Sequence, residues 1–187
     1  QQRDETMMVE TKRQTTADFD ALPEGTLVQL IDGELMSSPA PTPTHQWIIM
    51  QLGGQLNGFV LNHKLGFVYS SPIDVYFLED EAYQPDIIFI SHERLKQQPE
   101  KITIAPDLIV EVLSPSNAYH YLVHKKNVYE ASGVKEYWIV DPREKTVEVF
   151  ENRSGLFVLR VKANKTGTVS SALLAGFVFN LDAIFSV

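Results

Sequence analysis

The chain has 187 residues, of which 44% are hydrophobic and 21% are charged, a balance typical of one globular domain with little extended disorder. It contains no cysteine, which excludes disulfide frameworks and thiolate metal sites such as zinc ribbons. No apolar run approaches the ~20 residues needed to span a bilayer, and residues 1–14 are too polar for a signal peptide. We therefore expect a single cytoplasmic domain over residues 1–187, with 1–14 as a flexible leader and no membrane partner.

The net charge of −8 is unfavourable for a protein that binds nucleic acid, because affinity for phosphate chains comes largely from lysine and arginine. The acidic and basic residues are partly separated along the chain, however. Glu79, Asp80 and Glu81 are contiguous, whereas several basic residues follow later. These basic residues are Lys125, Lys126, Lys135, Arg143 and Lys145. A local basic groove is compatible with this distribution, but tight non-specific binding of DNA is not expected.

The first predicted element is a β-hairpin. Residues 26–31 and 34–36 have strand character and flank Asp32-Gly33, a dipeptide that suits a tight turn because both residues tolerate positive φ. The proline-rich segment 38–43 cannot continue a ladder, and Thr44 offers a side-chain oxygen that can cap a helix. A hairpin followed by a helix start near His45 is therefore predicted.

The pattern from His45 to about Asn62 predicts an amphipathic helix with one face on the core, because its apolar residues recur at helical spacing. These apolar residues are Ile48, Leu52, Leu56, Phe59 and Val60.

The remainder of the chain mixes strands and helices. A second helix is predicted from Tyr121 to Ser132, with Gly133 placed to terminate it, and a short helix is predicted at 181–185. The order of elements favours an α+β fold with no internal repeat or linker. Strands are predicted from β-branched and aromatic runs at 67–69, 73–77, 86–90, 108–113, 137–140, 147–150 and 157–161.

Glu111 is the most informative residue of the sequence, because it interrupts an otherwise apolar strand at 108–113. Burying an ionised carboxylate without a partner costs several kcal/mol, so an acid in such a strand usually has a cation, a metal or a strong donor beside it. A structural ion pair or a strand edge that faces water is an alternative of comparable weight.

Asp86 begins the strand at 86–90, whereas Glu111 lies near the end of its own strand. If the two strands pair antiparallel, the two carboxylates meet and form an oxygen-rich site of the kind that Mg²⁺ accepts. The alternative for Asp86 is an acid in a turn after proline, which spacing alone favours somewhat. Asp107 also follows a proline, but it lies at the opposite end of its strand from Glu111, so we expect no role for it in the site.

Lys125 is the candidate cation. A nuclease needs a positive group that orients water and offsets charge growing on the phosphate. The helical neighbours of Lys125 include Tyr121, Val128 and Tyr129, so its stem lies on a largely apolar stripe. A solvated lysine is the commoner case for any single position, and Lys126 fits that description better.

Several ordered blocks of the sequence match one family pattern. The blocks are Asp32-Gly33-Glu34, Ser38-Pro39-Ala40-Pro41 with His45-Gln46, Gln84-Pro85-Asp86, Pro106-Asp107-Leu108 with residues 111–116, Lys125, and Gly133-Val134 with residues 136–142. Together they resemble a bacterial family of restriction-endonuclease-like domains, and the resemblance covers nearly the whole chain. It implies the PD-(D/E)xK nuclease core, a mixed central β-sheet flanked by helices with an N-terminal hairpin, in which Asp86 and Glu111 are metal ligands.

Two positions depart from the pattern of the family. The general motif has its lysine two residues after the second acid, where this chain has Leu113, and the resemblance implies that Lys125 on the next helix replaces it. Members often carry an acid where this chain has Tyr121, so a supporting charge is absent. The sequence therefore leaves open whether activity is retained, altered or lost. Glu34 and His45 match the early blocks and are candidates to line the site, without a catalytic role assigned to either.

The sequence thus predicts metal-assisted hydrolysis of DNA, in which Asp86 and Glu111 hold Mg²⁺ (or Mn²⁺) and Lys125 positions the attacking water. The resemblance also implies a possible homodimer, since many nucleases of this class use one active site per strand. An alternative is an inactive nuclease fold that serves as a binding or assembly module. Glycoside hydrolysis by the paired carboxylates is a third alternative, which the lysine and the lack of an aromatic sugar platform disfavour.

Overall fold

The computed structural model describes residues 12–114 and 119–186. Residues 1–11 of the predicted leader lie outside the described residues, as do Pro115 and Ser116 of the block at 111–116. At the start of the described chain, the amide of Gln14 donates to the carbonyl of Gly33 at 2.8 Å. The first described residues therefore contact the turn of the β-hairpin.

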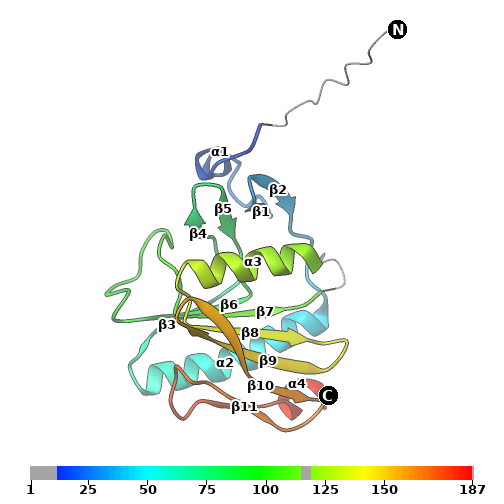
Figure 1. The fold of residues 1–187 in the computed structure, drawn as a ribbon. Coiled ribbons are helices and arrows are strands. Elements are labelled where there is room, and N and C mark those ends of the chain that lie inside the picture. The colour runs from blue at the N-terminus through cyan, green and yellow to red at the C-terminus, as the bar shows by residue number, and fades with distance from the viewer. Residues whose placement is uncertain (1–11, 115–118, 187) are drawn as a thin grey trace.

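A six-stranded sheet forms the centre of the molecule (Figure 1), with the strand order β10-β9-β8-β7-β6-β3. Strands β7 and β8 are parallel, and the other neighbours are antiparallel, so the sheet is mixed, as predicted. The strands are β3 (Gly66–Ser70), β6 (Ile87–Ser91), β7 (Leu108–Val112), β8 (Glu136–Asp141), β9 (Thr146–Arg153) and β10 (Leu156–Asn164).

Two helices, α2 (Pro43–Asn62) and α3 (Tyr119–Ala131), cover opposite faces of this sheet (Figure 1). Both predicted helices are confirmed, but α2 begins two residues before His45. The capping residue is Thr42 instead of Thr44, and its side chain accepts from the amide of His45 at 3.2 Å. Pro43 suits the first helical position because its fixed φ is helical and an amide there has no partner within the helix.

Each face of the sheet packs on its own core. On the α2 face, the apolar stripe that includes Ile48 and Leu52 packs against Val110 and Val112 of β7. On the α3 face, the core includes Ile109 of the same strand. Because successive residues of a strand point to opposite faces, a strand covered on both sides is apolar at most of its positions, which explains why Glu111 is the one acid in the apolar run of β7.

A smaller sheet with the order β2-β1-β5-β4 carries the predicted hairpin, whose turn contains Asp32 at φ 51° and Gly33 at φ 72°. The segment predicted as a strand at 73–77 pairs in this sheet and not in the central one. Helix α1 and strand β5 were not predicted, and neither were strands β11 (Thr168–Ser170) and β12 (Val178–Asn180), which follow later in the chain. The bounds are α1 (Thr16–Asp20), β1 (Val28–Ile31), β2 (Glu34–Ser37), β4 (Val75–Leu78) and β5 (Glu81–Tyr83).

The segment after β10 completes the α2 side of the molecule. It contains β11 (Thr168–Ser170), β12 (Val178–Asn180) and α4 (Asp182–Phe185), the last of which confirms the short helix predicted at 181–185. Its residues Phe177, Phe179, Leu181 and Ile184 are buried in the same core as α2. Among the helices that the structure describes, none combines the length and the apolar character that a membrane span requires.

Gly66, at the start of β3, is required by close approach of the backbone. A Cβ at this position would lie 2.1 Å from the carbonyl oxygen of Ile90. We expect Gly66→Ala to lower the free energy of unfolding by about 1–3 kcal/mol, because the backbone must shift to relieve the overlap. Urea titration measures this change.

Gly54 provides the matched control for Gly66. It is exposed in α2, and a Cβ there would meet no atom within 4 Å. Gly54→Ala should therefore stabilise the protein by up to about 1 kcal/mol through helix propensity. A loss of stability of equal size in both variants would contradict the argument from backbone contact.

Candidate active site

Two carboxylates lie on adjacent strands of the central sheet. Strands β6 and β7 are antiparallel with Ile87 opposite Val110, which confirms the predicted pairing. Asp86 precedes Ile87 and Glu111 follows Val110, so the register places the two acids side by side. Ile109, two residues before Glu111, belongs to the core beneath α3. Both acids therefore face this helix.

Helix α3 contributes two side chains to the same place. The Nζ atom of Lys125 lies 3.2 Å from Oε1 of Glu111, and the hydroxyl of Tyr129 donates to that oxygen at 2.6 Å. Lys125 and Tyr129 are four residues apart and so share one face of the helix. The three residues predicted from sequence, Asp86, Glu111 and Lys125, are thus brought together.

His45, near the start of α2, fixes the other side of the cluster. Its Nε2 atom lies 3.1 Å from the carbonyl oxygen of Val112, to which it donates, and 3.3 Å from Oδ2 of Asp86. The same Oδ2 accepts the amide of Val112 at 2.7 Å. Asp86 is therefore oriented by a backbone amide of the neighbouring strand and by an imidazole from the opposite side of the sheet.

The cluster is almost enclosed by protein. Asp86, Glu111 and Lys125 expose 8%, 4% and 8% of their surface. Burial raises the pKa of Glu111, and the nearby charge of Asp86 raises it further, whereas Lys125 and the Tyr129 hydroxyl act in the opposite direction. The surroundings of Glu111 therefore make its ionised form less stable than it is in water, as is common for acids at functional sites.

The pKa of His45 is also displaced. Burial acts to lower it, but the hydrogen bond and the negative charge of Asp86, supported by the carbonyl of Val112 and the charge of Glu111, outweigh burial and raise it. Within the described residues, Nδ1 of His45 is buried without a hydrogen-bond partner. His45 consequently acts through Nε2, as a donor that holds the two groups it contacts.

The donor set of the cluster fits a divalent cation of the Mg²⁺ type. Asp86 and Glu111 supply hard carboxylate oxygens, which are the ligands that Mg²⁺ prefers. The two ionised carboxylates repel each other, since the charge of Asp86 raises the pKa of Glu111. Lys125 contacts Glu111 and His45 contacts Asp86, and a divalent cation held by both carboxylates would offset their mutual repulsion further.

Four other residues discussed from the sequence lie outside this cluster or border it. Glu34 is exposed on β2. Asp107 is fully buried before β7 and binds Arg94 and Lys135, which is a structural role. Leu113 donates its amide to Val140, and Tyr121 is half-buried at the edge of the α3 core.

Buried phenols around the cluster were not predicted. Tyr129 binds Glu111, and the ring of Tyr83 lies 5.3 Å from Nζ of Lys125. The charges of Glu111 and Asp86 contribute, after burial, to raising the pKa of Tyr137, which places its hydroxyl in the same electrostatic environment. Of these residues, only Tyr129 had an indication in the sequence, its spacing of four from Lys125.

Comparison with known proteins identifies a family and a similar fold. Residues 16–182 match a family model described as "Uma2: Putative restriction endonuclease". The fold is similar to the crystal structure of a "putative nuclease belonging to DUF820" from Anabaena variabilis, with a TM-score of 0.79 and 21% identity. The match covers 92% of this chain and 97% of that chain. No curated protein matches the sequence.

Proposed function

The chain belongs to the Uma2 family, and from this premise we propose that it is a Mg²⁺-dependent endonuclease that hydrolyses phosphodiester bonds in DNA. The observation that carries the proposal is the convergence of Asp86, Glu111 and Lys125 on the α3 face of the central sheet. A pair of carboxylates with a buried ammonium group is suited to hold a divalent cation beside a phosphate.

Each residue has a distinct part in the proposed reaction. Asp86 and Glu111 would hold Mg²⁺, which when bound supplies a Lewis acid that polarises the phosphate and favours ionisation of water. Lys125 orients the attacking water and offsets the negative charge that grows on the phosphate. Tyr129 and Lys125 both bind Oε1 of Glu111 and so restrict the rotation of this carboxylate.

The acidic balance of the chain affects how the activity should be sought. With a net charge of −8, the protein gains little affinity from non-specific contacts to phosphates, and such contacts weaken further as salt rises. We therefore expect cleavage to be detected at low ionic strength first. The dependence on DNA sequence is then read from the cleavage products.

The proposed function is tested by incubating the purified protein with supercoiled plasmid and with single-stranded DNA in Mg²⁺, Mn²⁺ or EDTA. We expect cleavage that requires the metal and stops in EDTA. Nicked circles would indicate independent cuts in one strand, and direct conversion to linear plasmid would indicate paired active sites, as in the proposed homodimer. Absence of cleavage with either metal, together with DNA binding, would favour an inactive nuclease fold that serves as a binding module.

His45 is predicted to position Asp86 and the Val112 carbonyl without touching the substrate. Loss of such a supporting contact typically costs a metal site about 10–100-fold in affinity or activity. We expect His45→Ala to show a loss of this size and to require a higher Mg²⁺ concentration for its half-maximal rate. His45→Gln should recover part of the loss, because its amide can donate to the same carbonyl.

Steady-state cleavage measured over a range of Mg²⁺ concentrations checks the role of His45, with thermal unfolding as a control for folding. A purely structural role would lower stability without shifting the metal dependence. An unchanged half-maximal Mg²⁺ concentration in His45→Ala would therefore contradict the prediction.

A further inference from the structure

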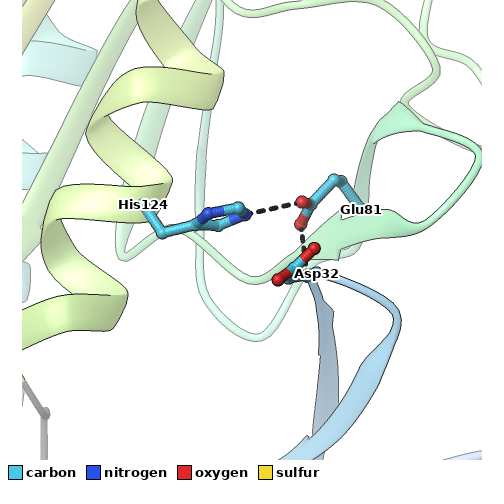
Figure 2. A group of neighbouring side chains, drawn as sticks. All are labelled: Asp32, Glu81 and His124. Atoms are coloured by element: carbon cyan, nitrogen blue, oxygen red, sulfur yellow. Dashed lines mark hydrogen bonds and ion pairs between the residues drawn. The ribbon is translucent and has the colours of Figure 1, made fainter. Parts of the chain in front are cut away.

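A second group of side chains, of types that can bind a metal ion, lies outside the cluster of Asp86, Glu111 and Lys125. Asp32, Glu81 and His124 each offer one ligand atom, and these atoms all lie within 4.8 Å of one another. Figure 2 shows that the three side chains come from different elements, the β1–β2 turn, strand β5 and helix α3, and that they point toward one another. Residues far apart in the sequence therefore converge at one point between the small sheet and α3.

Glu81 is the centre of this group and is almost fully buried, at 3% exposure. Its Oε1 atom lies 2.6 Å from Nε2 of His124, and its Oε2 accepts the amide of Asp32 at 3.0 Å and the hydroxyl of Tyr83. The side chains of His124 and Asp32 are 34% and 60% exposed. The group is thus buried on the side of Glu81 and open to solvent on the side of Asp32 and His124, from which an ion can enter.

The local charge favours a cation at this position. Asp32 and Asp80 both contact the guanidinium of Arg13, which binds one oxygen of Asp32. Asp32 and Asp80 thus share a single guanidinium, and the carboxylate of Glu81 lies near that of Asp32. Burying the charge of Glu81 beside these acids is costly unless a positive group compensates it, and a divalent ion would do so.

One imidazole nitrogen and two carboxylate oxygens are a suitable ligand set for Zn²⁺, which often takes three protein ligands and a water molecule. In a tetrahedral site with bonds of about 2.0–2.1 Å, ligand atoms are about 3.4 Å apart. The 2.6 Å between Nε2 of His124 and Oε1 of Glu81 would have to widen, and the longer separations, all within 4.8 Å, would have to shorten. Rotations of Asp32 and His124, both of which are partly exposed, allow these changes. The nitrogen ligand favours Zn²⁺ over Mg²⁺ and Ca²⁺, which prefer oxygen.

We propose that Asp32, Glu81 and His124 form a Zn²⁺ site that fastens the small N-terminal sheet to helix α3. His124 immediately precedes Lys125 on this helix. Tyr83 connects the two sites, because its hydroxyl binds Glu81 and its ring lies 5.7 Å from that of Tyr129. A metal at this position holds α3 in the place from which Lys125 and Tyr129 reach Glu111.

Zinc binding is tested on the untagged full chain in which Asp86→Asn and Glu111→Gln remove the catalytic acids. After dialysis against EDTA, calorimetric titration with ZnCl₂ should give one ion per chain. His124→Gln and Glu81→Gln, added separately, should weaken binding about 100-fold or more, since loss of a contact that merely supports a metal ligand already costs about 10–100-fold. His120→Gln is the matched control, because His120 is exposed one turn earlier on α3, and it should bind as the parent does.

Thermal unfolding gives a second measurement, which does not depend on DNA cleavage. ZnCl₂ should raise the unfolding temperature of the parent and of His120→Gln but not that of His124→Gln, because a ligand stabilises only the fold that binds it. Failure of the parent to bind Zn²⁺, or equal binding by His124→Gln, would overturn the proposal. In that case the hydrogen bond between His124 and Glu81 is the whole interaction. Since the parent lacks the catalytic acids, neither outcome depends on the proposed nuclease function.

Discussion

Glu111→Gln, Asp86→Asn and Lys125→Met are each expected to reduce metal-dependent DNA cleavage by about 10³-fold or more, the scale of losing a charge that stabilises a transition state. Glutamine and asparagine keep the shape of the acids but remove the negative charge that holds a divalent cation. Methionine keeps the apolar stem of Lys125 and removes its ammonium. Rates measured in a single turnover with excess protein report the chemical step directly.

Lys126→Met is the matched control for Lys125→Met. Lys126 is the next residue of α3, and its Nζ atom lies over the ring of Phe150, 3.7 Å from the ring centre. This variant should cut DNA at nearly the native rate. Circular dichroism and thermal unfolding verify that each variant is folded. Native rates in the Glu111→Gln and Asp86→Asn variants would show that the cluster is not the active site.

Asp107→Asn is expected to cause the largest loss of stability from a single charge, about 3 kcal/mol at pH 7. Asp107 is completely buried, and its carboxylate accepts the amide of Ser91 at 2.8 Å. It also lies 3.2 Å from Arg94 and 2.8 Å from Lys135. Both cations are partly exposed and regain water when the charge is removed, which keeps the loss below that of a fully buried pair.

The effect of Asp107→Asn should depend on pH. Burial acts to raise the pKa of Asp107, but Lys135, Ser91 and Arg94 outweigh burial and lower it. Its pKa is therefore lower in the folded state than in the unfolded state, where it is about 3.9. The stability that this charge contributes is present above the unfolded pKa and is lost as pH falls through the folded pKa.

Urea titrations of the native protein and of Asp107→Asn at several pH values check this dependence. The difference in unfolding free energy should be constant near neutral pH and should shrink below about pH 4. A difference that stays constant down to acid pH would show that the charge of Asp107 is not what stabilises the fold.

Elements with a clear sequence pattern were predictable, whereas α1, β5, β11 and β12, which have three to five residues each, were not. The helix that begins near His45 and the strand that contains Glu111 have patterns long enough to identify. Strand β5 has three residues, of which Glu81 and Tyr83 become buried only because α3 lies over them. Such strands exist through tertiary packing, so their own residues carry little evidence of them.

The residues of the candidate site were also predictable only in part. Glu111 was identified because an acid in an apolar strand needs a partner, and the pairing with Asp86 followed from the opposite ends they occupy. The contacts of His45 could not be foreseen, since they depend on α2 meeting the end of β7 from the other face of the sheet. To predict that Asp32, Glu81 and His124 converge, the relative positions of three separate elements would have had to be known.

The two cores of the central sheet differ in when their residues become available during synthesis. The core beneath α3 is built from residues up to Phe157, whereas the core beneath α2 also contains Phe177, Phe179 and Ile184. Chains emerge from the ribosome in order, and domains begin to fold before synthesis ends. We therefore expect a nascent chain that has already assembled the core beneath α3 to leave exposed, for a time, the part of the α2 core that Phe177, Phe179 and Ile184 later cover. This interval is when the protein is most exposed to aggregation and to capture by chaperones.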